Sequence, residues 1–232
     1  ALLIPIDVST IQITYINIMN KKTILFMACQ FAWLAPFAQE SKKALSWQDI
    51  PAWEYIRTNG TQASADGKWF AYVAGPTQGD LTLSLRKTQD TTNYAYKIGG
   101  LNSAISFNNN SEFIAFYESP NFKEIKANEK AKKPNSRKLK LVSLKDTATT
   151  TFNNVQSYTF ANEDNKWIAI RFDTGSSVPP RGDDAAKGND LLLYNLITKK
   201  SYNLGNVSDY SFNKSGQFLA YIVDANGKNG NG

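Results

Sequence analysis

The sequence has 232 residues, of which 42% are hydrophobic and 20% are charged, a balance typical of a folded protein with a sizeable core. It contains no histidine and one cysteine, Cys29, which excludes a Ser-His-Asp or Cys-His arrangement, a His-ligated zinc site and an internal disulfide built from this chain alone. Residues 123–140 hold eight Lys/Arg and two Glu and so account for the whole net charge of +6, which we interpret as one basic, solvated loop rather than a nucleic-acid surface.

The N-terminal residues have the order of a targeting signal. A basic stretch at 19–22 precedes an apolar run at 23–37, and the chain becomes polar after Ala38. This order is typical of a secretory signal peptide cleaved after Ala38, and the run is too short to span a bilayer comfortably. We therefore predict a signal peptide at 19–38, an upstream extension outside the fold at 1–18, and export to the periplasm or beyond the cell.

Two alternatives stay open at this end of the chain. Residues 26–29 form a weak lipobox ending in Cys29, which would make the protein a lipoprotein instead of an ordinarily cleaved one. Residues 11–16 alternate in a way that suits a strand, so the extension could belong to the fold.

Residues 39–60 are predicted to form a helical lead-in. Ser46 suits an N-cap position, and Pro51 suits the first turn of a second short helix. At helical spacing one apolar face would contain Trp47, Ile50, Trp53 and Ile56. We expect that face to pack on the rest of the protein rather than to bind a ligand.

A four-residue core then recurs four times. Its copies are 69–72 (WFAY), 113–116 (FIAF), 167–170 (WIAI) and 218–221 (FLAY). The alanines are 44, 54 and 51 residues apart, and each core follows a polar turn rich in Asp, Asn, Ser and Gly. Such residues tolerate the left-handed conformations of tight hairpins. A period near 50 residues indicates a repeat architecture.

Strands surround each core in the same order. A strand before the turn ends at 105–107, 158–160 and 210–212. A third strand follows at 81–85, 139–142 and 191–194, and a fourth at 94–98, 150–153 and 201–204. Alternate residues of the core strand are apolar on both sides, so both sheet faces must be covered, and the small alanine would let the neighbouring sheet approach closely.

Four strands per unit predict an all-β fold, a partial β-propeller of about three and a half four-stranded antiparallel blades over 61–232. A β-sandwich would explain many short strands but not the recurrence of one core. The last unit ends after its second strand, so we expect further blades and any catalytic domain to be missing.

Three segments resemble a known family. Residues 47–50 (WQDI), 53–56 (WEYI) and 64–72 (SADGKWFAY) resemble the start of exported prolyl oligopeptidase-family (S9) serine peptidases, and 38–39 (AQ) resembles signal ends common in Bacteroidetes. The repeated unit is also similar to those of TolB-like and WD40-like propellers. The resemblance implies a propeller joined to an α/β-hydrolase domain, whose nucleophile elbow has the pattern G-x-S-x-G.

This chain has neither that pattern nor a histidine. No catalytic, cofactor-binding or metal-binding residue is therefore assigned to it, and no cofactor is expected. We expect the isolated chain to be inactive towards peptides and esters.

The leading hypothesis for function is the propeller part of an exported serine peptidase. Its partners would be a peptide substrate and the C-terminal hydrolase domain of the parent protein, with no nucleic acid and no stable membrane span. The alternatives are a non-catalytic TolB-like binding or scaffold propeller and a polysaccharide- or surface-associated propeller.

Two long connections join a second strand to a third strand, at 121–137 and 174–189. Equivalent connections leave a blade at the same end, so we expect both on one face of the propeller, as flexible loops. The second contains an Arg-Gly-Asp tripeptide at 181–183, which we interpret as a chance occurrence.

Overall fold

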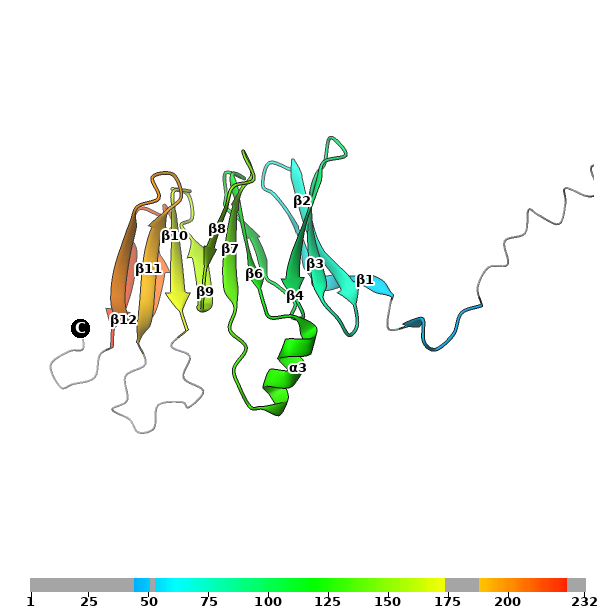
Figure 1. Ribbon diagram of the computed structural model, residues 1–232. Coiled ribbons are helices and arrows are strands. Elements are labelled where there is room, and N and C mark those ends of the chain that lie inside the picture. Colours follow the sequence, from blue (N-terminus) through cyan, green and yellow to red (C-terminus); the bar gives the residue numbers. More distant parts are fainter. Residues whose placement is uncertain (1–43, 51–52, 174–187, 225–232) are drawn as a thin grey trace, which may run out of the picture. The chain divides into compact units, whose positions relative to one another are not determined.

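The computed structural model describes residues 44–50, 53–173 and 188–224. The chain divides into two units, Ala1–Ser46 and Trp47–Gly232. All described strands belong to the second unit (Figure 1). The predicted signal peptide and the extension before it lie outside the described residues.

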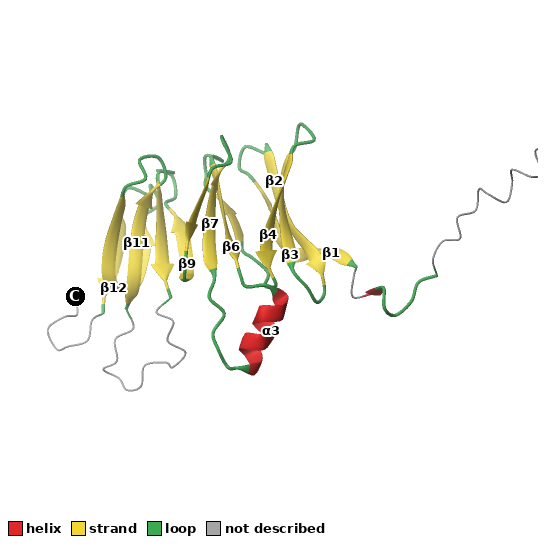
Figure 2. Cartoon of the chain, in the orientation of Figure 1, coloured by secondary structure: helices red, strands yellow, loops and turns green. Residues whose placement is uncertain are grey.

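The second unit is a partial β-propeller built from three antiparallel sheets that follow one another along the chain (Figures 1 and 2). The first sheet has the order β1 (Glu54–Ala63), β2 (Trp69–Pro76), β3 (Leu81–Lys87) and β4 (Asn93–Gly99). The second has the order β5 (Ile105–Phe107), β6 (Phe113–Glu118), β7 (Lys138–Ser143) and β8 (Thr149–Phe152). The third contains β9 (Val155–Phe160), β10 (Trp167–Phe172), β11 (Asn189–Asn195), β12 (Ser201–Phe212) and β13 (Leu219–Val223).

The four alanine-centred cores lie in equivalent strands, as predicted. Three of them form β2, β6 and β10, the second strand of each sheet. The long strand β12 serves two blades, because its first part pairs with β11 and its second part pairs with β13. Val207, at the change-over, has a Cα partner on each side. The fourth core therefore follows a first strand just as the others do, in a half-blade made of β12 and β13.

The turns before the four cores repeat one backbone conformation. Each contains one residue with a left-handed φ, namely Gly67 at 69°, Ser111 at 59°, Asn165 at 54° and Gly216 at 73°. In three of the turns a side chain accepts a hydrogen bond from the first residue of the core. These bonds are Trp69 N to Ser64 Oγ (3.0 Å), Phe113 N to Asn108 Oδ1 (2.8 Å) and Phe218 N to Asn213 Oδ1 (3.1 Å).

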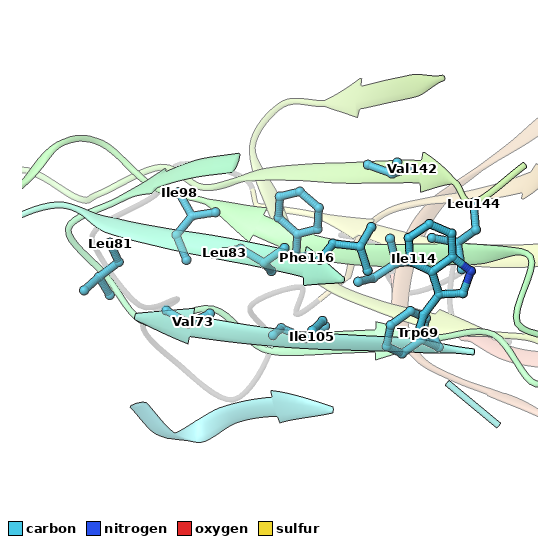
Figure 3. Packing of buried hydrophobic residues seen from close by; sticks show 13 residues of the cluster. Trp69, Val73, Leu81, Leu83, Ile98, Ile105, Ile114, Phe116, Val142 and Leu144 are labelled. Atoms are coloured by element: carbon cyan, nitrogen blue, oxygen red, sulfur yellow. The ribbon is translucent and has the colours of Figure 1, made fainter. Parts of the chain in front are cut away.

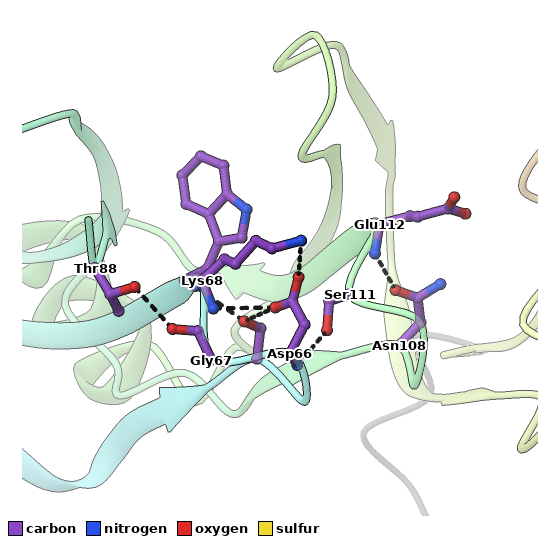
Figure 4. A network of polar contacts seen from close by, with 9 residues as sticks. Asp66, Gly67, Lys68, Thr88, Asn108, Ser111 and Glu112 are labelled. Carbon is purple, nitrogen blue, oxygen red and sulfur yellow. Dashed lines mark hydrogen bonds and ion pairs between the residues drawn. The ribbon is translucent and has the colours of Figure 1, made fainter. Parts of the chain in front are cut away.

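Hydrogen bonds also connect each turn to the next (Figure 4). The amide of Asp66 donates to Ser111 Oγ at 3.1 Å. Asn110 N donates to Asn165 Oδ1 at 3.0 Å, and Asn162 Nδ2 donates to Asn213 O at 3.0 Å. The polar residues that the hairpins require thus also hold neighbouring blades together at this end of the sheets.

The first joint between sheets is apolar (Figure 3). Trp69, Ala71 and Val73 of β2 are buried with side chains of β3 and β4 against Ile114 and Phe116 of β6. Burying a side chain of the size of Val, Leu, Ile or Phe contributes about 1.5–3 kcal/mol. Such joints are therefore the main source of stability for the stacked sheets.

The second and third joints repeat this arrangement. Phe113, Ala115 and Tyr117 of β6 pack with Ile168 and Ile170 of β10. Ala169, on the other side of β10, packs with Leu191 and Val207 and with the half-blade. Each of the first three repeated alanines is fully buried, which fits the close approach of blades predicted from its size.

One tyrosine hydroxyl crosses the second joint. Tyr158 of β9 donates to the carbonyl of Ala115 at 3.0 Å, and its ring meets that of Tyr117 edge-on at 5.2 Å. Burial raises the pKa of Tyr158 well above its ordinary value. The hydroxyl therefore keeps its proton and its role as a donor.

The helical lead-in expected at 39–60 is wrong over residues 54–60, which belong to β1, the partner strand of β2. Before them, residues 47–49 form a turn and Ile50 has a 3-10 helical conformation. Trp47 is 86% exposed, so the apolar face predicted for a helix has no core to cover there. Pairing with β2 satisfies the backbone groups of 54–63 instead, and the first blade begins at Glu54 rather than at residue 61.

The first long connection is not the loop that was expected. It contains the helix α3 (Phe122–Lys130), at the end of the sheets opposite the turns (Figure 1). The second connection falls largely outside the described residues, so the prediction that both leave the same face stays a prediction. Among the described residues no helix is long and apolar enough to cross a membrane.

Candidate ligand-binding cleft

A polar cleft of about 480 Å³ lies where β4 of the first sheet meets β6 and β7 of the second. Its walls include Asp80, Tyr96 and Lys97 from the first sheet and Glu118 and Lys140 from the second. A second hollow of about 430 Å³ is lined by Glu118, by the start of α3, and by residues next to β7 and β8, namely Ser136, Lys138, Asn153 and Asn154. Glu118, Ser119 and Asn121 line both hollows.

Glu118 is the charged centre of this region. Its Oε2 lies 2.7 Å from Lys140 Nζ, and its Oε1 lies 3.7 Å from Lys138 Nζ. The side chains of Glu118 and Lys140 are 24% and 26% exposed, whereas that of Lys138 is 53% exposed. The antiparallel register explains the geometry, since Glu118 lies opposite Lys138 and Phe116 lies opposite Lys140. Two cations on one carboxylate leave a local excess of positive charge.

Two glycines let the first sheet approach this region closely. Gly99 has a φ of 79°, and a Cβ there would lie 2.1 Å from the carbonyl oxygen of Ser119. At Gly100 a Cβ would lie 2.6 Å from Phe122 Cα. The backbone contacts are completed by bonds from Gly100 N to Pro120 O and from Ser119 N to Ile98 O, each 2.9 Å long. Any side chain at these glycines would force the cleft walls apart.

The helix α3 begins at the rim of the cleft. Asn121 is its N-cap and accepts a hydrogen bond from Glu124 N at 2.8 Å. Asp80, from the first sheet, accepts a bond from Phe122 N at 2.6 Å. These acceptors satisfy two of the amides that a helix start leaves free. Ile125 is 2% exposed and is the buried residue of the helix.

The arrangement presents carboxylates and ammonium groups that can bind a charged or polar group. The chain has no histidine, and no cluster of metal-ligating residues occurs in the described part. Burial raises the pKa of Tyr96, with the neighbouring Tyr94 as a smaller cause, so Tyr96 is a neutral hydroxyl rather than a base. No site residue was assigned from the sequence, and that assignment stays a prediction.

Part of the basic segment behaves differently from the solvated loop that was expected. Lys138 and Lys140 pair with Glu118, and Lys126 pairs with Glu129 at 2.8 Å. Arg137 lies over the ring of Tyr117, with its Cζ 4.5 Å from the centroid. The Arg-Gly-Asp tripeptide at 181–183 lies outside the described residues.

The sequence did contain a signal for α3. Asn121 followed by Glu124 is the spacing of a capping box, and the residues after it are mostly good helix formers. The density of lysine made the segment look like a solvated loop. No sequence signal marks the cleft, because Asp80, Lys97 and Glu118 come from different blades.

Comparison with known proteins gives a likeness of fold. No protein-family model matches the sequence, and no curated protein matches it. Among solved structures, the β-propeller domain of the Trilobed protease from Pyrococcus furiosus matches over 73% of this chain and 48% of its own, with 12% identity and a TM-score of 0.46. TolB from Acinetobacter baumannii matches over 77% and 39%, with 16% identity and a TM-score of 0.40. A prolyl endopeptidase matches over 88% and 32%, with 12% identity and a TM-score of 0.48.

The chain spans less than half the length of each of these three proteins. At these identities the likeness concerns the propeller fold alone. This likeness of fold is distant, and it includes both peptidases and TolB.

Proposed function

We propose that this chain is the propeller part of an exported serine peptidase of the prolyl oligopeptidase type, and that it does no chemistry itself. Its role would be to restrict access to a hydrolase domain and to position the charged ends of peptides. The observation that carries the proposal is the cleft at Glu118, where two carboxylates and two ammonium groups line a hollow in a chain without histidine. The resemblance of residues 47–56 and 64–72 to exported peptidases supports it.

The cleft suits a peptide end because it presents both signs of charge. Lys97 and Lys140 lie on facing walls and can attract a terminal carboxylate, whereas Asp80 and Glu118 can attract a terminal ammonium group. Lys140 is three-quarters buried, so its charge is less screened by solvent than that of an exposed lysine. A peptide carboxylate would compete with Glu118 for Lys140.

Peptide binding to the purified chain tests the role of the cleft. We expect Lys140→Gln to weaken binding of a short fluorescent peptide with a free C-terminus about tenfold, a loss typical of a charge-assisted hydrogen bond. Lys126→Gln is the matched control, because Lys126 also pairs with a glutamate, at 2.8 Å, but lies outside the cleft. Fluorescence anisotropy would measure both affinities. Equal affinities for the two variants would contradict the assignment.

The peptidase part of the proposal has its own test. Sequencing the gene beyond the codon for Gly232 should show a G-x-S-x-G pattern followed by Asp and then His. Further blades and a stop codon without that pattern would favour the TolB-like binding or scaffold propeller instead. Turnover by the isolated chain that depended on one of its own serines would contradict a non-catalytic role.

A further inference from the structure

The helix α3 projects beyond the ends of β6 and β7, and its two sides differ in chemistry (Figure 2). Ile125 is buried and Asn128 is half-buried, and their spacing of three residues places them on one side of the helix. Lys123, Lys126 and Lys130 are exposed, and their spacing of three and four residues places them together on the other side. The side of α3 that faces away from the protein is therefore a row of lysines.

Two further exposed lysines, Lys132 and Lys133, follow the end of this helix. Their amides donate to Glu129 O at 3.2 Å and to Asn128 O at 2.9 Å, so the chain stays against the last turn of α3. We call the five exposed lysines of this segment the lysine surface, namely Lys123, Lys126, Lys130, Lys132 and Lys133. The residues that line the cleft and the second hollow include none of the five, so the lysine surface is separate from the site at Glu118.

The stability of the helix does not explain these lysines. Lys123 lies in the first turn, where the helix dipole favours a negative charge. Lys126 and Lys130 are four residues apart, a spacing at which like charges on a helix repel each other. Of the three lysines within the helix, Lys130 alone is in the last turn, where the dipole favours a positive charge.

The lysines at the opposite end of the sheets are balanced by carboxylates, whereas the lysine surface is not. Three lysines of the turns pair with an aspartate of the same turn: Lys68 with Asp66 (3.3 Å), Lys87 with Asp90 (3.8 Å) and Lys166 with Asp164 (3.3 Å). On the lysine surface, Lys126 alone forms an ion pair within the described part of the chain, with Glu129. Residues 123–140 carry the whole net charge of +6, so the positive charge of the molecule is concentrated at the end where α3 lies.

The side chains of this segment do not suit the core of a protein interface or the reading of a nucleic acid. Cores of protein interfaces are rich in aromatic residues and arginine and poor in lysine, and no large apolar side chain is exposed between residues 122 and 138. Recognition of nucleic acids favours arginine, which binds phosphates and bases through two hydrogen bonds. The one arginine here, Arg137, lies over the Tyr117 ring and donates to Gln156 O. The lysine surface thus fits a partner that attracts hydrated point charges.

We propose that the lysine surface binds the surface of a lipid bilayer that contains anionic phospholipids. Clusters of about four to eight lysines or arginines on a helix are typical of such binding, in which the negative surface potential attracts ammonium groups that stay hydrated. The apolar residue of α3, Ile125, is already buried in the protein, so the helix rests on the headgroups and does not insert. Binding of this kind orients the protein with α3 towards the bilayer. This inference is independent of the proposed function.

Co-sedimentation of the full chain with vesicles tests the proposal. The readout is the ratio of two partition coefficients, one for vesicles of phosphatidylcholine with about 30% phosphatidylglycerol and one for vesicles of phosphatidylcholine alone. The ratio is used because the apolar run at 23–37 can bind vesicles of either kind. For the wild type we expect a ratio of at least about one hundred at low salt, and we expect it to fall steeply between about 50 and 500 mM salt.

Three triple variants locate the effect. Changing Lys123, Lys126 and Lys130 to Gln, a good helix former, should lower the ratio at least about tenfold, since each lysine near such a surface contributes about fivefold. The matched control changes Lys145, Lys200 and Lys214 to Gln. These exposed lysines lie in turns at the opposite end of the sheets, so the control removes the same charge and should keep the ratio within about threefold. Changing the three helical lysines to Arg keeps the charge and should also keep the ratio within about threefold.

Several results would overturn the proposal. A wild-type ratio near one at low salt means that the lysine surface does not bind anionic lipid. Equal losses in the two glutamine variants mean that net charge, and not this surface, attracts the protein to the vesicles. Tighter binding of the wild type to duplex DNA or to polyglutamate than to anionic vesicles at the same salt concentration assigns the surface to another class of partner.

Discussion

Two glycines in this molecule have left-handed backbones for different reasons. Gly67 has a φ of 69° with no atom within 4 Å of the position of a Cβ, whereas Gly99 has a φ of 79° and a Cβ there would lie 2.1 Å from a backbone oxygen. At Gly67 only the local conformation requires glycine. At Gly99 the neighbouring sheet requires it as well.

We therefore expect Gly99→Ala to destabilise the protein more than Gly67→Ala does. The conformational penalty of an alanine in the left-handed region is about 1–2 kcal/mol at either position. Gly99→Ala should cost at least about 1–3 kcal/mol beyond that, as overpacking does elsewhere. Urea unfolding followed by tryptophan fluorescence would measure both. Equal losses would show that the contact with Ser119 can relax.

Asp66 gives the first turn a dependence on pH. A hydrogen bond from Ser64 Oγ, followed by one from the amide of Lys68, lowers the pKa of Asp66 to about 2. Because the folded-state pKa lies below the unfolded value of 3.8, the stabilisation is complete above that value and is lost as the pH falls towards 2.

The wild type should therefore be more stable than Asp66→Asn at pH 5, and the difference should shrink as the pH falls towards 2. Chemical denaturation of both proteins at several pH values would measure it. Because both proteins contain the same other carboxyl groups, the contributions of those groups cancel in the difference between their unfolding free energies. A difference that stays constant over this range would contradict the role of the charge.

Two arginines from unrelated strand positions make the same contact. Arg137, just before β7, donates to Gln156 O at 2.9 Å, and Arg171, in β10, donates to Ser208 O at 2.8 Å. Gln156 follows Val155, the first residue of β9, and Ser208 follows Val207, where β12 changes its partner strand. Both valines are buried. The repeat thus conserves a contact between neighbouring blades without conserving the position of the residue that makes it.

At the scale of elements, the core strand changes its environment from blade to blade while its pattern stays the same. All of the first five residues of β6 are buried, because sheets cover both its faces. On β2 only one face is fully buried, and most of β13 is exposed. The expectation that both faces are covered therefore holds for inner blades only.

The alanines of β10 and β13 provide a matched test. Ala169 is fully buried in a joint, whereas Ala220 is exposed at the equivalent position. We expect Ala169→Leu to destabilise the chain by about 1–3 kcal/mol through overpacking, and Ala220→Leu to change stability by less than about 0.5 kcal/mol.

Urea denaturation followed by tryptophan fluorescence would measure both variants. An Ala169→Leu variant with an unchanged free energy of unfolding would show that the joint can accommodate the larger side chain. A large loss of stability in Ala220→Leu would contradict the exposed environment of Ala220.

At the scale of the whole molecule, two kinds of contact hold the sheets together. Apolar joints supply the stabilising area, and hydrogen bonds between successive turns set the alignment of one blade on the next. The contacts at the other end, around Gly99 and α3, build the cleft. In the first two blades, the turn end thus aligns neighbouring sheets, and the other end forms the candidate binding surface.

The sequence by itself determined the repeat. An alternating apolar core after a polar turn depends on local chemistry, namely strand periodicity and residues that tolerate left-handed backbones. For that reason the left-handed turns before the cores were predictable, and so were the strands of the blades apart from β1. The helix α3 could also have been predicted, because Asn121 and Glu124 have the spacing of a capping box.

Only the tertiary structure decided the rest. The cleft joins Asp80 and Lys97 of one blade to Glu118 of another, and no local pattern reveals such a meeting. Residues 54–60 became a strand because β2 offered an edge to pair with, although their apolar spacing also suited a helix. The exposure of each core strand depends on whether a sheet packs on either side of it. This exposure depends on the packing of several sheets and cannot be determined from one segment.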